Sequence, residues 1–540
     1  MSAARTEGLA PPRALAALPD LLAHRPRIAA AGFGLVAATG FPPLTLWPIA
    51  MLGLAGFAWL VWRAKNWKQA ALLGWLFGFS HLTLANNWIA TAFTFQSEMP
   101  AALGWVAVPL LCIYLAVFPA ISCALARLLA GRAASLAIFA PALGAGWIVG
   151  EWLRSWVFTG YAWAPLSLML VGPFERPGAA LALPFAGTYA LSGLLLMLVT
   201  LSLAAVRARR WLLAAIPAGA LAAAMLWPAP APEEGSLPFT LVQPNLRQDE
   251  INDASRYEEQ FQRIAALSRP RAATSNRLIL WPESAVPDYL EPGYPQIYYD
   301  EATAGADPAF ARERIANVGA AGSLVLTGTV NLKIGRANGH ASATGAYNSI
   351  LAVGPGGGIA GRYDKAHLVP YGEYLPMRGL LEPLGLSRLV AGTLDFIPGP
   401  GPRTVDLGPW GKAGAQICYE IVFSGEVVDP THRPDYIFNP SNDGWFGAWG
   451  PPQHLAQARM RAIEEGLPVL RATTTGISAV VDAHGVVRAA IGRDRANRID
   501  GVVPPALAPT PFSRLGAWLT GIWTALLAAA SLVASRRTSR

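Results

Sequence analysis

The chain has 540 residues, of which 53% are hydrophobic and only 14% are charged. A soluble domain usually carries about 25% charged residues, so this composition excludes an ordinary soluble protein. The net charge is +8, but Lys and Arg flank apolar segments, a pattern typical of membrane-protein loops and not of nucleic-acid binding. The three cysteines are an odd and sparse set that predicts no disulfide framework.

Eight apolar segments approach the roughly 20 residues that a helix needs to cross a bilayer. They predict a membrane α-helical bundle of about eight spans, seven before a long aqueous stretch and one after it. The first segment is broken by Gly40, Pro42 and Pro43 and is expected to form a hairpin with the second. A cleaved signal peptide is the alternative interpretation of that first segment. The predicted spans are 28–41, 44–62, 69–90, 102–126, 133–155, 185–206, 211–228 and 515–534.

Basic loops alternate with neutral loops along these spans. Lys and Arg are retained on the cytoplasmic side of bacterial membranes, so both termini are predicted to be cytoplasmic. The chain then divides into a membrane domain (1–228), an aqueous domain on the periplasmic face (229–514) and a final span with a cytoplasmic tail (515–540). The basic residues are Arg5, Arg13, Arg25, Arg27, Arg63, Lys65, Lys68, Arg127, Arg132, Arg207, Arg209, Arg210, Arg536, Arg537 and Arg540.

Two charged residues lie inside the fifth predicted span, Glu151 and Arg154, at helical i, i+3 spacing. Charges within a membrane are costly and often functional. The alternative is an interfacial ion pair that orients the helix, and the sequence leaves both interpretations open.

From Phe239 onward the pattern changes to short β-favouring runs bounded by Gly, Pro, Asn or Asp. Helical patterns at 252–268, 307–320 and 452–465 separate several of them, which predicts a layered α/β domain. The seven histidines are scattered, so no metal site is predicted, and no cofactor motif is apparent. The predicted strands lie within 239–245, 277–284, 323–330, 348–355, 413–423, 435–443 and 477–488.

Three residues at predicted strand ends offer a nucleophile and its partners. Cys418 is a candidate thiolate, and Lys365 is expected to lower its pKa and to stabilise an oxyanion. Glu283 is a candidate general base. Singly, each has an ordinary alternative, namely a buried packing cysteine, a solvated lysine and a turn-capping glutamate. Because strand ends on one side of an α/β sheet converge, their joint occurrence favours a catalytic set.

The motifs WPES (281–284), YDKAHLVPYGEYLP (363–376) and CYE (418–420) resemble the Glu–Lys–Cys set of the nitrilase superfamily. Between seven predicted spans and a final one, they are similar to the apolipoprotein N-acyltransferase family of Gram-negative bacteria. The resemblance extends to GEWLRSWVFTGYAW (150–163), YNSI (347–350) and NPSNDGWFG (439–447). It implies a nitrilase-like αββα sandwich for the aqueous domain.

The resemblance also implies roles for individual residues. Glu283 would be the base, Lys365 the oxyanion-stabilising lysine and Cys418 the nucleophile. Supporting positions are implied for Glu373, which orients Lys365 or assists proton transfer, for Tyr419 and Glu420, which shape the site, and for Asn348, a polar contact on the substrate side. The family often has an aromatic residue and a lysine after its first nitrilase strand, where this chain has Ile251 and Asn252.

The reaction implied by the resemblance has two steps. The Cys418 thiolate takes the sn-1 acyl chain of a phospholipid, typically phosphatidylethanolamine, and a lysophospholipid leaves. The thioester then acylates the α-amine of the diacylglyceryl cysteine that begins an apolipoprotein. The implied partners are therefore the phospholipid donor, the apolipoprotein acceptor and the bilayer of the bacterial inner membrane, with the enzyme acting as a monomer and binding no nucleic acid.

Apolar and aromatic loops in the aqueous domain are candidates for lipid contact. The run 376–392 is predicted to be an arm that dips into the outer leaflet, with a helix packed on the domain core as the alternative. The aromatic loops 289–300 and 443–454 are lid candidates, or ordinary packed loops. The leucines and valine of the arm are Leu380, Leu381, Leu384, Leu386, Leu389 and Val390.

Two other functions compete with acyl transfer. A membrane-tethered amidase would use the same three residues, with water in place of the amine, but it would need only one anchor. A polytopic transporter or scaffold with an inactive outer domain would leave Cys418 without a role, and the predicted spans lack the broken repeats of transporters.

Overall fold

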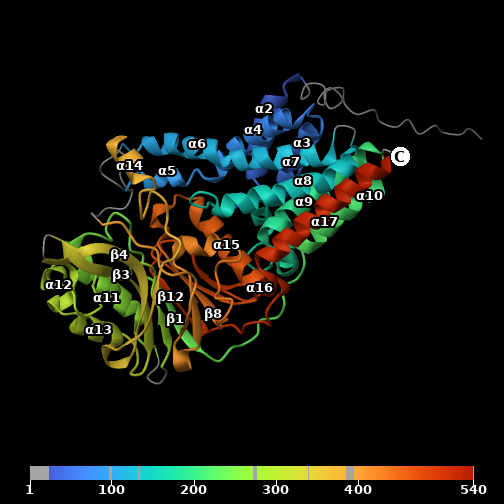
Figure 1. Cartoon of the computed structure of the whole chain (residues 1–540). Helices are drawn as coiled ribbons and strands as arrows, with labels where there is room; N and C mark the ends of the chain where they lie inside the picture. The colour runs from blue at the N-terminus through green and yellow to red at the C-terminus, as the bar shows by residue number, and fades with distance from the viewer. Residues whose placement is uncertain are drawn as a thin grey trace, which may run out of the picture.

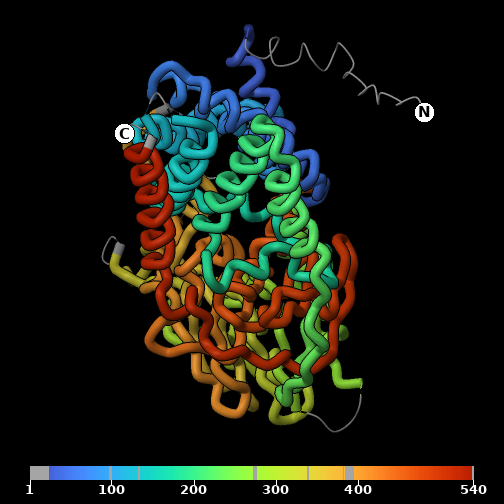
Figure 2. The backbone as a smooth tube through the Cα atoms, turned by 90° about the vertical axis from the view of Figure 1, so that its right-hand side faces the viewer, coloured from blue at the N-terminus to red at the C-terminus, as the bar shows by residue number. Residues whose placement is uncertain are grey.

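The structure, a computed structural model, describes residues 24–95, 100–131, 134–271, 276–337, 340–384 and 394–538. It has two parts, a bundle of apolar helices and an α/β domain beside one end of that bundle (Figure 1). The view turned by 90° shows the C-terminal helix running away from the α/β domain, so that its end lies at the remote end of the bundle (Figure 2).

The bundle contains a helix in every segment that the sequence predicts to be a span. Apolar residues surround most of these helices, as expected for segments that contact either lipid or one another. The longest helix of the bundle, α9, is interrupted at Gly187, which has a positive φ of 71°. The bundle helices are α2 (Pro26–Ala38), α3 (Trp47–Trp62), α4 (Trp67–Ala85), α5 (Ile89–Ala92), α6 (Leu103–Leu115), α7 (Val117–Ala130), α8 (Leu136–Trp156), α9 (Leu183–Arg207), α10 (Trp211–Met225) and α17 (Ala517–Thr538).

Only four helical segments in the described chain are long and apolar enough to cross a membrane on their own: 103–130, 136–156, 179–207 and 517–537. The helices α2, α3 and α10 are apolar but have 13, 16 and 15 residues, which is short of the roughly 20 that a perpendicular span needs. The helical membrane bundle is thus found as predicted, but the structure does not bear out the full count of eight spans.

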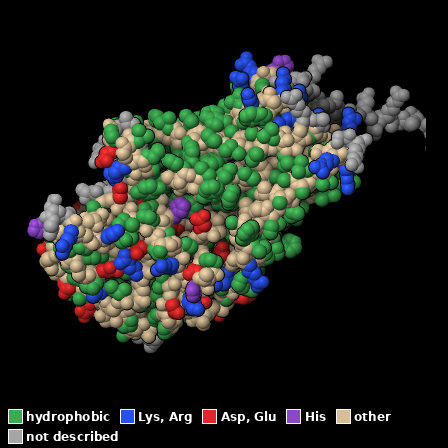
Figure 3. All heavy atoms as spheres, in the orientation of Figure 1, with side chains coloured by type: hydrophobic (Ala, Val, Ile, Leu, Met, Phe, Trp, Pro, Cys, Tyr) green, Lys and Arg blue, Asp and Glu red, His purple; other side chains and the backbone are tan. Residues whose placement is uncertain are grey.

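The flank of the bundle is hydrophobic and its remote end is basic. Green side chains cover the flank on the face drawn in Figure 3, and blue side chains gather at the end away from the α/β domain. A continuous exposed apolar surface of this kind is typical of contact with lipid. Large hydrophobic residues exposed on the bundle helices α6, α10 and α17 include Trp105, Val106, Leu110, Leu212, Leu213, Ile216, Trp518, Ile522 and Leu526.

The α/β domain is built on two six-stranded sheets. The first has the strand order β12-β1-β2-β3-β4-β5 and the second the order β11-β10-β9-β8-β7-β6. In the first sheet the adjacent strands β1, β2 and β3 pair in parallel, and in the second sheet β7, β8 and β9 do so. The other strands of both sheets pair antiparallel. The strands are β1 (Pro238–Gln243), β2 (Leu278–Leu280), β3 (Leu324–Ala337), β4 (His340–Val353), β5 (Ile359–Asp364), β6 (Thr404–Asp406), β7 (Lys412–Ala415), β8 (Tyr436–Ser441), β9 (Val469–Thr473), β10 (Ser478–Val481), β11 (Val487–Ile491) and β12 (Asn497–Val502).

The two sheets pack face to face between layers of helix. Leu241 and Leu280 of the first sheet share one apolar core with Phe438 and Leu470 of the second. Helices cover the outer faces, which gives the predicted helix–sheet–sheet–helix order. These helices are α11 (Tyr257–Ser268) and α13 (Pro308–Ala316) on the first sheet and α15 (Gly450–Glu465) on the second, with the short α12 (Gln296–Ala302), α14 (Arg378–Leu381) and α16 (Pro511–Leu515) in the connections.

Helix α15 lies between the second sheet and the bundle and bonds to both. The guanidinium of Arg459 donates to the main-chain oxygen of Gly172 at 2.7 Å. Glu464 accepts from the backbone N–H of Thr188 at 2.7 Å, where α9 restarts after Gly187, and a carboxylate at a helix N-terminus is stabilising. Because these groups are buried and bonded, the bundle and the α/β domain form one continuous core.

Candidate active site

Cys418 occupies a sharp turn between a strand and a short helix. Strand β7 ends at Ala415, Gln416 donates its N–H to Phe438 of the neighbouring strand at 2.9 Å, and the 3-10 helix Cys418–Val422 begins at the cysteine itself. The φ of Cys418 is 51°, in the left-handed region that few side-chain-bearing residues adopt. Such strain persists where the surroundings enforce it, and it is concentrated at functional sites.

The other predicted residues form one buried cluster. The Nζ of Lys365 lies 2.9 Å from Glu373 Oε2 and 3.6 Å from Glu283 Oε1. The side-chain amide of Asn348 donates to both carboxylates, at 2.7 Å to Glu283 and 2.8 Å to Glu373. The backbone N–H of Asn442 donates to the second oxygen of Glu283 at 2.8 Å. Asn348 therefore holds the two carboxylates in place, and its expected contact with the substrate stays a prediction.

The local fold explains how these side chains meet. Glu283 follows β2, and Lys365 follows β5 of the same sheet, where its N–H donates to the Asn348 oxygen at 2.8 Å. Strand β3 crosses directly beside Glu283 at Gly328, where any Cβ would lie 2.7 Å from the Glu283 Cα. A glycine is thus required at 328 for the glutamate to reach its position.

The charges of the cluster determine the resting state of the nucleophile. Burial disfavours the ammonium of Lys365, but Glu373 and Glu283, with Cys418, raise its pKa above the usual range. Burial also raises the pKa of the Cys418 thiol, Glu283 adds to that rise, and Lys365 opposes it only in part. Burial and Glu283 therefore outweigh the expected lowering by Lys365, and the pKa of the Cys418 thiol stays above its ordinary value.

Glu420 joins the nucleophile turn to the lysine segment. Its carboxylate accepts from the N–H groups of Ala366 at 2.7 Å, His367 at 3.0 Å and Ile417 at 2.7 Å, and from the Tyr363 hydroxyl at 2.9 Å. Burial raises the pKa of Glu420 to about 7, and these hydrogen bonds oppose the rise. Glu420 is thus a structural tie between the two segments.

Tyr419 points the other way, toward the bundle. Its ring is buried in the core shared by the two parts of the molecule and stacks on Trp163 at 6.5 Å between ring centroids. Its hydroxyl has no hydrogen-bond partner among the residues that the structure describes. The residue beside the nucleophile thereby contacts the membrane bundle directly.

A buried polar chain behind the nucleophile went unrecognised in the sequence. His454 Nε2 lies 3.0 Å from the main-chain oxygen of Cys418, and Nδ1 lies 3.0 Å from Asp443 Oδ1. Arg471 donates to both oxygens of Asp443 at 2.8 Å. The three side chains are fully buried. The three residues are far apart in the sequence, so no sequence motif predicts that they meet.

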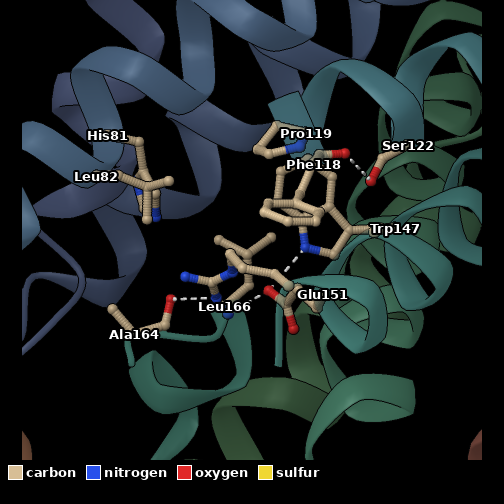
Figure 4. A pocket seen from close by; sticks show the side chains of 11 residues that line it. His81, Leu82, Phe118, Pro119, Ser122, Trp147, Glu151, Ala164 and Leu166 are labelled. Carbon is tan, nitrogen blue, oxygen red and sulfur yellow. Dashed lines mark hydrogen bonds between the residues drawn. The ribbon is translucent and has the colours of Figure 1, made fainter. Parts of the chain in front are cut away.

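Glu151 and Arg154 brace the loop that carries Trp163. Arg154 donates to the Trp163 oxygen at 2.7 Å, and Glu151 accepts from the Leu166 N–H at 2.8 Å and from Trp147. They line a cavity of about 20 Å³ with His81, and Figure 4 shows Glu151, Trp147 and Leu166 around it. Both residues are buried, and each bonds to the loop.

Comparison with known proteins identifies the family. Residues 33–202 match the family of apolipoprotein N-acyltransferase N-terminal domains, and residues 240–505 match the carbon-nitrogen hydrolase family. The chain is 33% identical to the apolipoprotein N-acyltransferase of Rhodopseudomonas palustris, with 92% of each chain covered. This chain belongs to the apolipoprotein N-acyltransferase family. The family resemblance inferred from the sequence is thereby confirmed.

Two other apolipoprotein N-acyltransferases have similar sequences. That of Bradyrhizobium diazoefficiens is 34% identical, with 93% of each chain covered. That of Vibrio vulnificus is 30% identical and covers 96% of this chain and 99% of its own. The match to the family thus extends over the bundle and the α/β domain together.

Of the segments predicted to contact lipid, only the arm 376–392 is incompletely described. In the arm, Leu380 of α14 is exposed, but Leu386, Leu389 and Val390 lie outside the described residues, as do the side chains of Leu381 and Leu384. In the loop 443–454, Phe446 packs against Trp88 of the bundle at 4.5 Å between ring centroids. The lid roles of this loop and of 289–300 stay predictions.

The segment after the first nitrilase strand differs from the pattern expected of the family. Ile251 is buried and Asn252 is exposed in a turn. Neither residue is aromatic, so these two positions do not supply the aromatic side chain that the family often has there.

Proposed function

We propose that this protein is an apolipoprotein N-acyltransferase that carries a fatty acyl chain on Cys418. The observation that carries the proposal is the position of the nucleophile. Cys418 lies in a buried cluster with a carboxylate and an ammonium, and the next residue packs against the membrane bundle. A lipid acyl donor and a lipid-anchored acceptor both reach such a site from the bilayer.

The first step forms the thioester. The Cys418 thiol attacks the sn-1 ester carbonyl of a phospholipid, and its proton moves to Glu283. Lys365 and a backbone N–H at the nucleophile turn stabilise the oxyanion. The tetrahedral intermediate collapses, the ester C–O bond breaks, and Glu283 returns the proton to the leaving lysophospholipid. Glu373 holds Lys365 charged and in place.

The second step forms the amide. The α-amine of the diacylglyceryl cysteine attacks the thioester carbonyl and loses its proton to Glu283. The C–S bond then breaks, and the thiolate of Cys418 recovers a proton from Glu283. No redox change occurs and no cofactor is required, since the acyl chain moves from ester to thioester to amide.

The arrangement in the cell follows from the basic end of the bundle. With eight spans, residues 1–228 form the membrane domain, 229–514 the catalytic domain, and 515–540 the last span and tail. Lys and Arg at the remote end of the bundle favour a cytoplasmic location for that end, so the catalytic domain is periplasmic in a Gram-negative inner membrane. The short helices α2, α3 and α10 would then span by local thinning or within the bundle. The enzyme acts as a monomer on phosphatidylethanolamine and apolipoproteins.

A transfer assay tests this function against the amidase alternative. The full-length protein in liposomes receives phospholipid labelled in the sn-1 chain and a diacylglyceryl lipopeptide. We expect labelled amide on the lipopeptide, and none with Cys418→Ala. Free labelled fatty acid with no acylated peptide would instead support a hydrolase, and transfer by Cys418→Ala would contradict the role of the cysteine.

A further inference from the structure

The buried chain Arg471–Asp443–His454 ends on the backbone of the nucleophile itself. His454 Nε2 is 3.0 Å from the main-chain oxygen of Cys418. The side-chain amide of Asn439 approaches the same oxygen less closely, at 3.5 Å, and bonds to the Gln416 oxygen at 2.6 Å. His454 is therefore the principal partner of the carbonyl that follows the strained φ of the cysteine.

The partner of His454 Nε2 determines that this ring nitrogen carries a hydrogen. A carbonyl oxygen only accepts, so Nε2 must carry a hydrogen and donate to Cys418. Nδ1 lies 3.0 Å from Arg471, which can only donate, and 3.0 Å from a carboxylate oxygen of Asp443, which can only accept, so these two contacts hold the ring in place without fixing a proton on Nδ1. Burial, followed by the charge of Arg471, lowers the pKa of His454, and Asp443 opposes that shift. The Nε2–H donor to Cys418 follows from the geometry alone.

Fixing this carbonyl also fixes the opposite edge of the same peptide. In a trans peptide the N–H points away from the C=O, and the bond between Cys418 and Tyr419 is trans. The Tyr419 N–H therefore points away from His454. It donates to no acceptor among the residues that the structure describes, so it is available to a substrate oxygen.

We propose that His454 is a positioning residue that holds the Cys418–Tyr419 peptide so that the Tyr419 N–H stabilises the oxyanion. This inference rests on the proposed acyl-enzyme chemistry and assigns to His454 the orientation of one oxyanion donor. Asp443 and Arg471 fix the ring, and Lys365 supplies the second donor from the first sheet. His454 does not touch the substrate.

A matched pair of amides tests the proposal. In His454→Gln the side-chain N–H₂ takes the place of Nε2 and reaches the Cys418 oxygen. In His454→Asn the side-chain N–H₂ takes the place of Nδ1 and faces Asp443 and Arg471. The Cys418 oxygen then has no donor from position 454. The control is Gln457→Leu, a buried polar residue of α15 whose side chain bonds to Gln453. All proteins are full length in liposomes.

Two rates are compared for each protein: acylation of Cys418 by phospholipid in a single turnover, and alkylation of Cys418 by iodoacetamide. Only acylation creates an oxyanion. Loss of one oxyanion donor lowers the catalytic rate by about 10²-fold to 10³-fold. We expect His454→Asn to slow acylation by about 10²-fold while alkylation stays close to wild type, and His454→Gln and Gln457→Leu to keep most of both rates.

Two outcomes overturn the proposal. One is equal acylation by the Asn and Gln variants. The other is a parallel loss of alkylation and acylation in the Asn variant, which would mean that the thiol or the fold had changed. If the wild type acquires no acyl mass although iodoacetamide modifies Cys418, it is the proposed function that fails.

Discussion

At the scale of single residues, the protonation of Cys418 decides how the site works. One ammonium, Lys365, faces two carboxylates, Glu283 and Glu373, so the cluster offers no net positive charge to a thiolate. The raised pKa of the thiol follows from this balance and from burial. Attack on an ester therefore requires a base at the moment of reaction, and Glu283 is the carboxylate placed for that role.

Replacing Glu283 tests the need for a base. Glu283→Gln keeps an acceptor oxygen but cannot take a proton, so we expect acylation of Cys418 to fall by about 10²-fold to 10⁴-fold. The rate is measured as acyl mass gained in a single turnover. Glu291→Gln, which alters a carboxylate paired with Arg362, is the matched control and should leave the rate unchanged. Normal acylation by Glu283→Gln would rule out this base.

The raised thiol pKa also predicts a pH profile. Burial raises the pKa of Cys418 above its ordinary value, so the thiolate fraction stays small at neutral pH and grows as pH rises. We expect iodoacetamide alkylation of Cys418 in the free enzyme to increase without a plateau from about pH 7 to about pH 9.5, beyond the ordinary thiol pKa of roughly 8.5. Cys112 and Cys123 are removed by substitution in this assay. A plateau below pH 8 would contradict the assignment.

The sequence predicted Glu283, Lys365 and Cys418 because each lies in a motif that resembles the nitrilase set. The structure places the side chains of the first two 3.6 Å apart. The sequence did not predict the state of the thiol, since burial and compensating charge depend on the folded environment. His454 was also missed, because its contact with Cys418 joins the second sheet's outer helix to a turn that lies 36 residues earlier in the chain.

At the scale of elements, Glu420 ties the turn after β7 to the segment after β5. Four donors converge on one carboxylate from both segments. The two segments carry the nucleophile and Lys365, and they belong to different sheets. This single side chain therefore links the segment of the nucleophile to the segment of Lys365.

Glu420→Gln is expected to loosen that tie. A glutamine must turn its N–H₂ toward either the Ile417 N–H or the N–H groups of Ala366 and His367, so at least one buried donor loses its acceptor. An unpaired buried donor costs about 1–3 kcal/mol. We expect a lower thermal unfolding temperature together with slower acylation. Unchanged values of both would show that the tie is dispensable.

The elements were predicted from the sequence with uneven success. The β-favouring runs at 239–245, 323–330 and 435–443 overlap β1, β3 and β8, because most residues of these runs are buried. Strands β5 and β12 were missed, since Ile359–Asp364 and Asn497–Val502 mix polar residues and glycine at sheet edges. Their pairing is set by neighbouring strands and not by local preference.

At the scale of the whole molecule, α15 couples the bundle to the catalytic domain. One side of the helix bonds to bundle loops through Arg459 and Glu464, and His454 bonds to the nucleophile turn. Hydropathy alone predicted eight spans, but the lengths of α2, α3 and α10 are limited by the flanking turns. A hydropathy pattern does not show where a helix ends, although Gly40, Pro42 and Pro43 mark the break after α2 in the sequence.

Cysteine labelling tests the orientation of the molecule in the membrane. Glu301→Cys lies on the exposed surface of the catalytic domain and Lys65→Cys on the basic end of the bundle, while the native cysteines are buried. A membrane-impermeant maleimide added to spheroplasts should label position 301 and should label position 65 only after permeabilisation. The reverse pattern would place the catalytic domain in the cytoplasm.

The thioester itself is the most direct test of the whole account. The full-length protein is incubated in liposomes with phospholipid of defined sn-1 chain and no acceptor, and the peptide that contains Cys418 is analysed by mass spectrometry. We predict an added mass equal to that acyl chain on Cys418, which hydroxylamine removes and which an amine acceptor discharges. If Cys418 never gains acyl mass from any phospholipid, or if the acyl group is found on another residue, the account is contradicted.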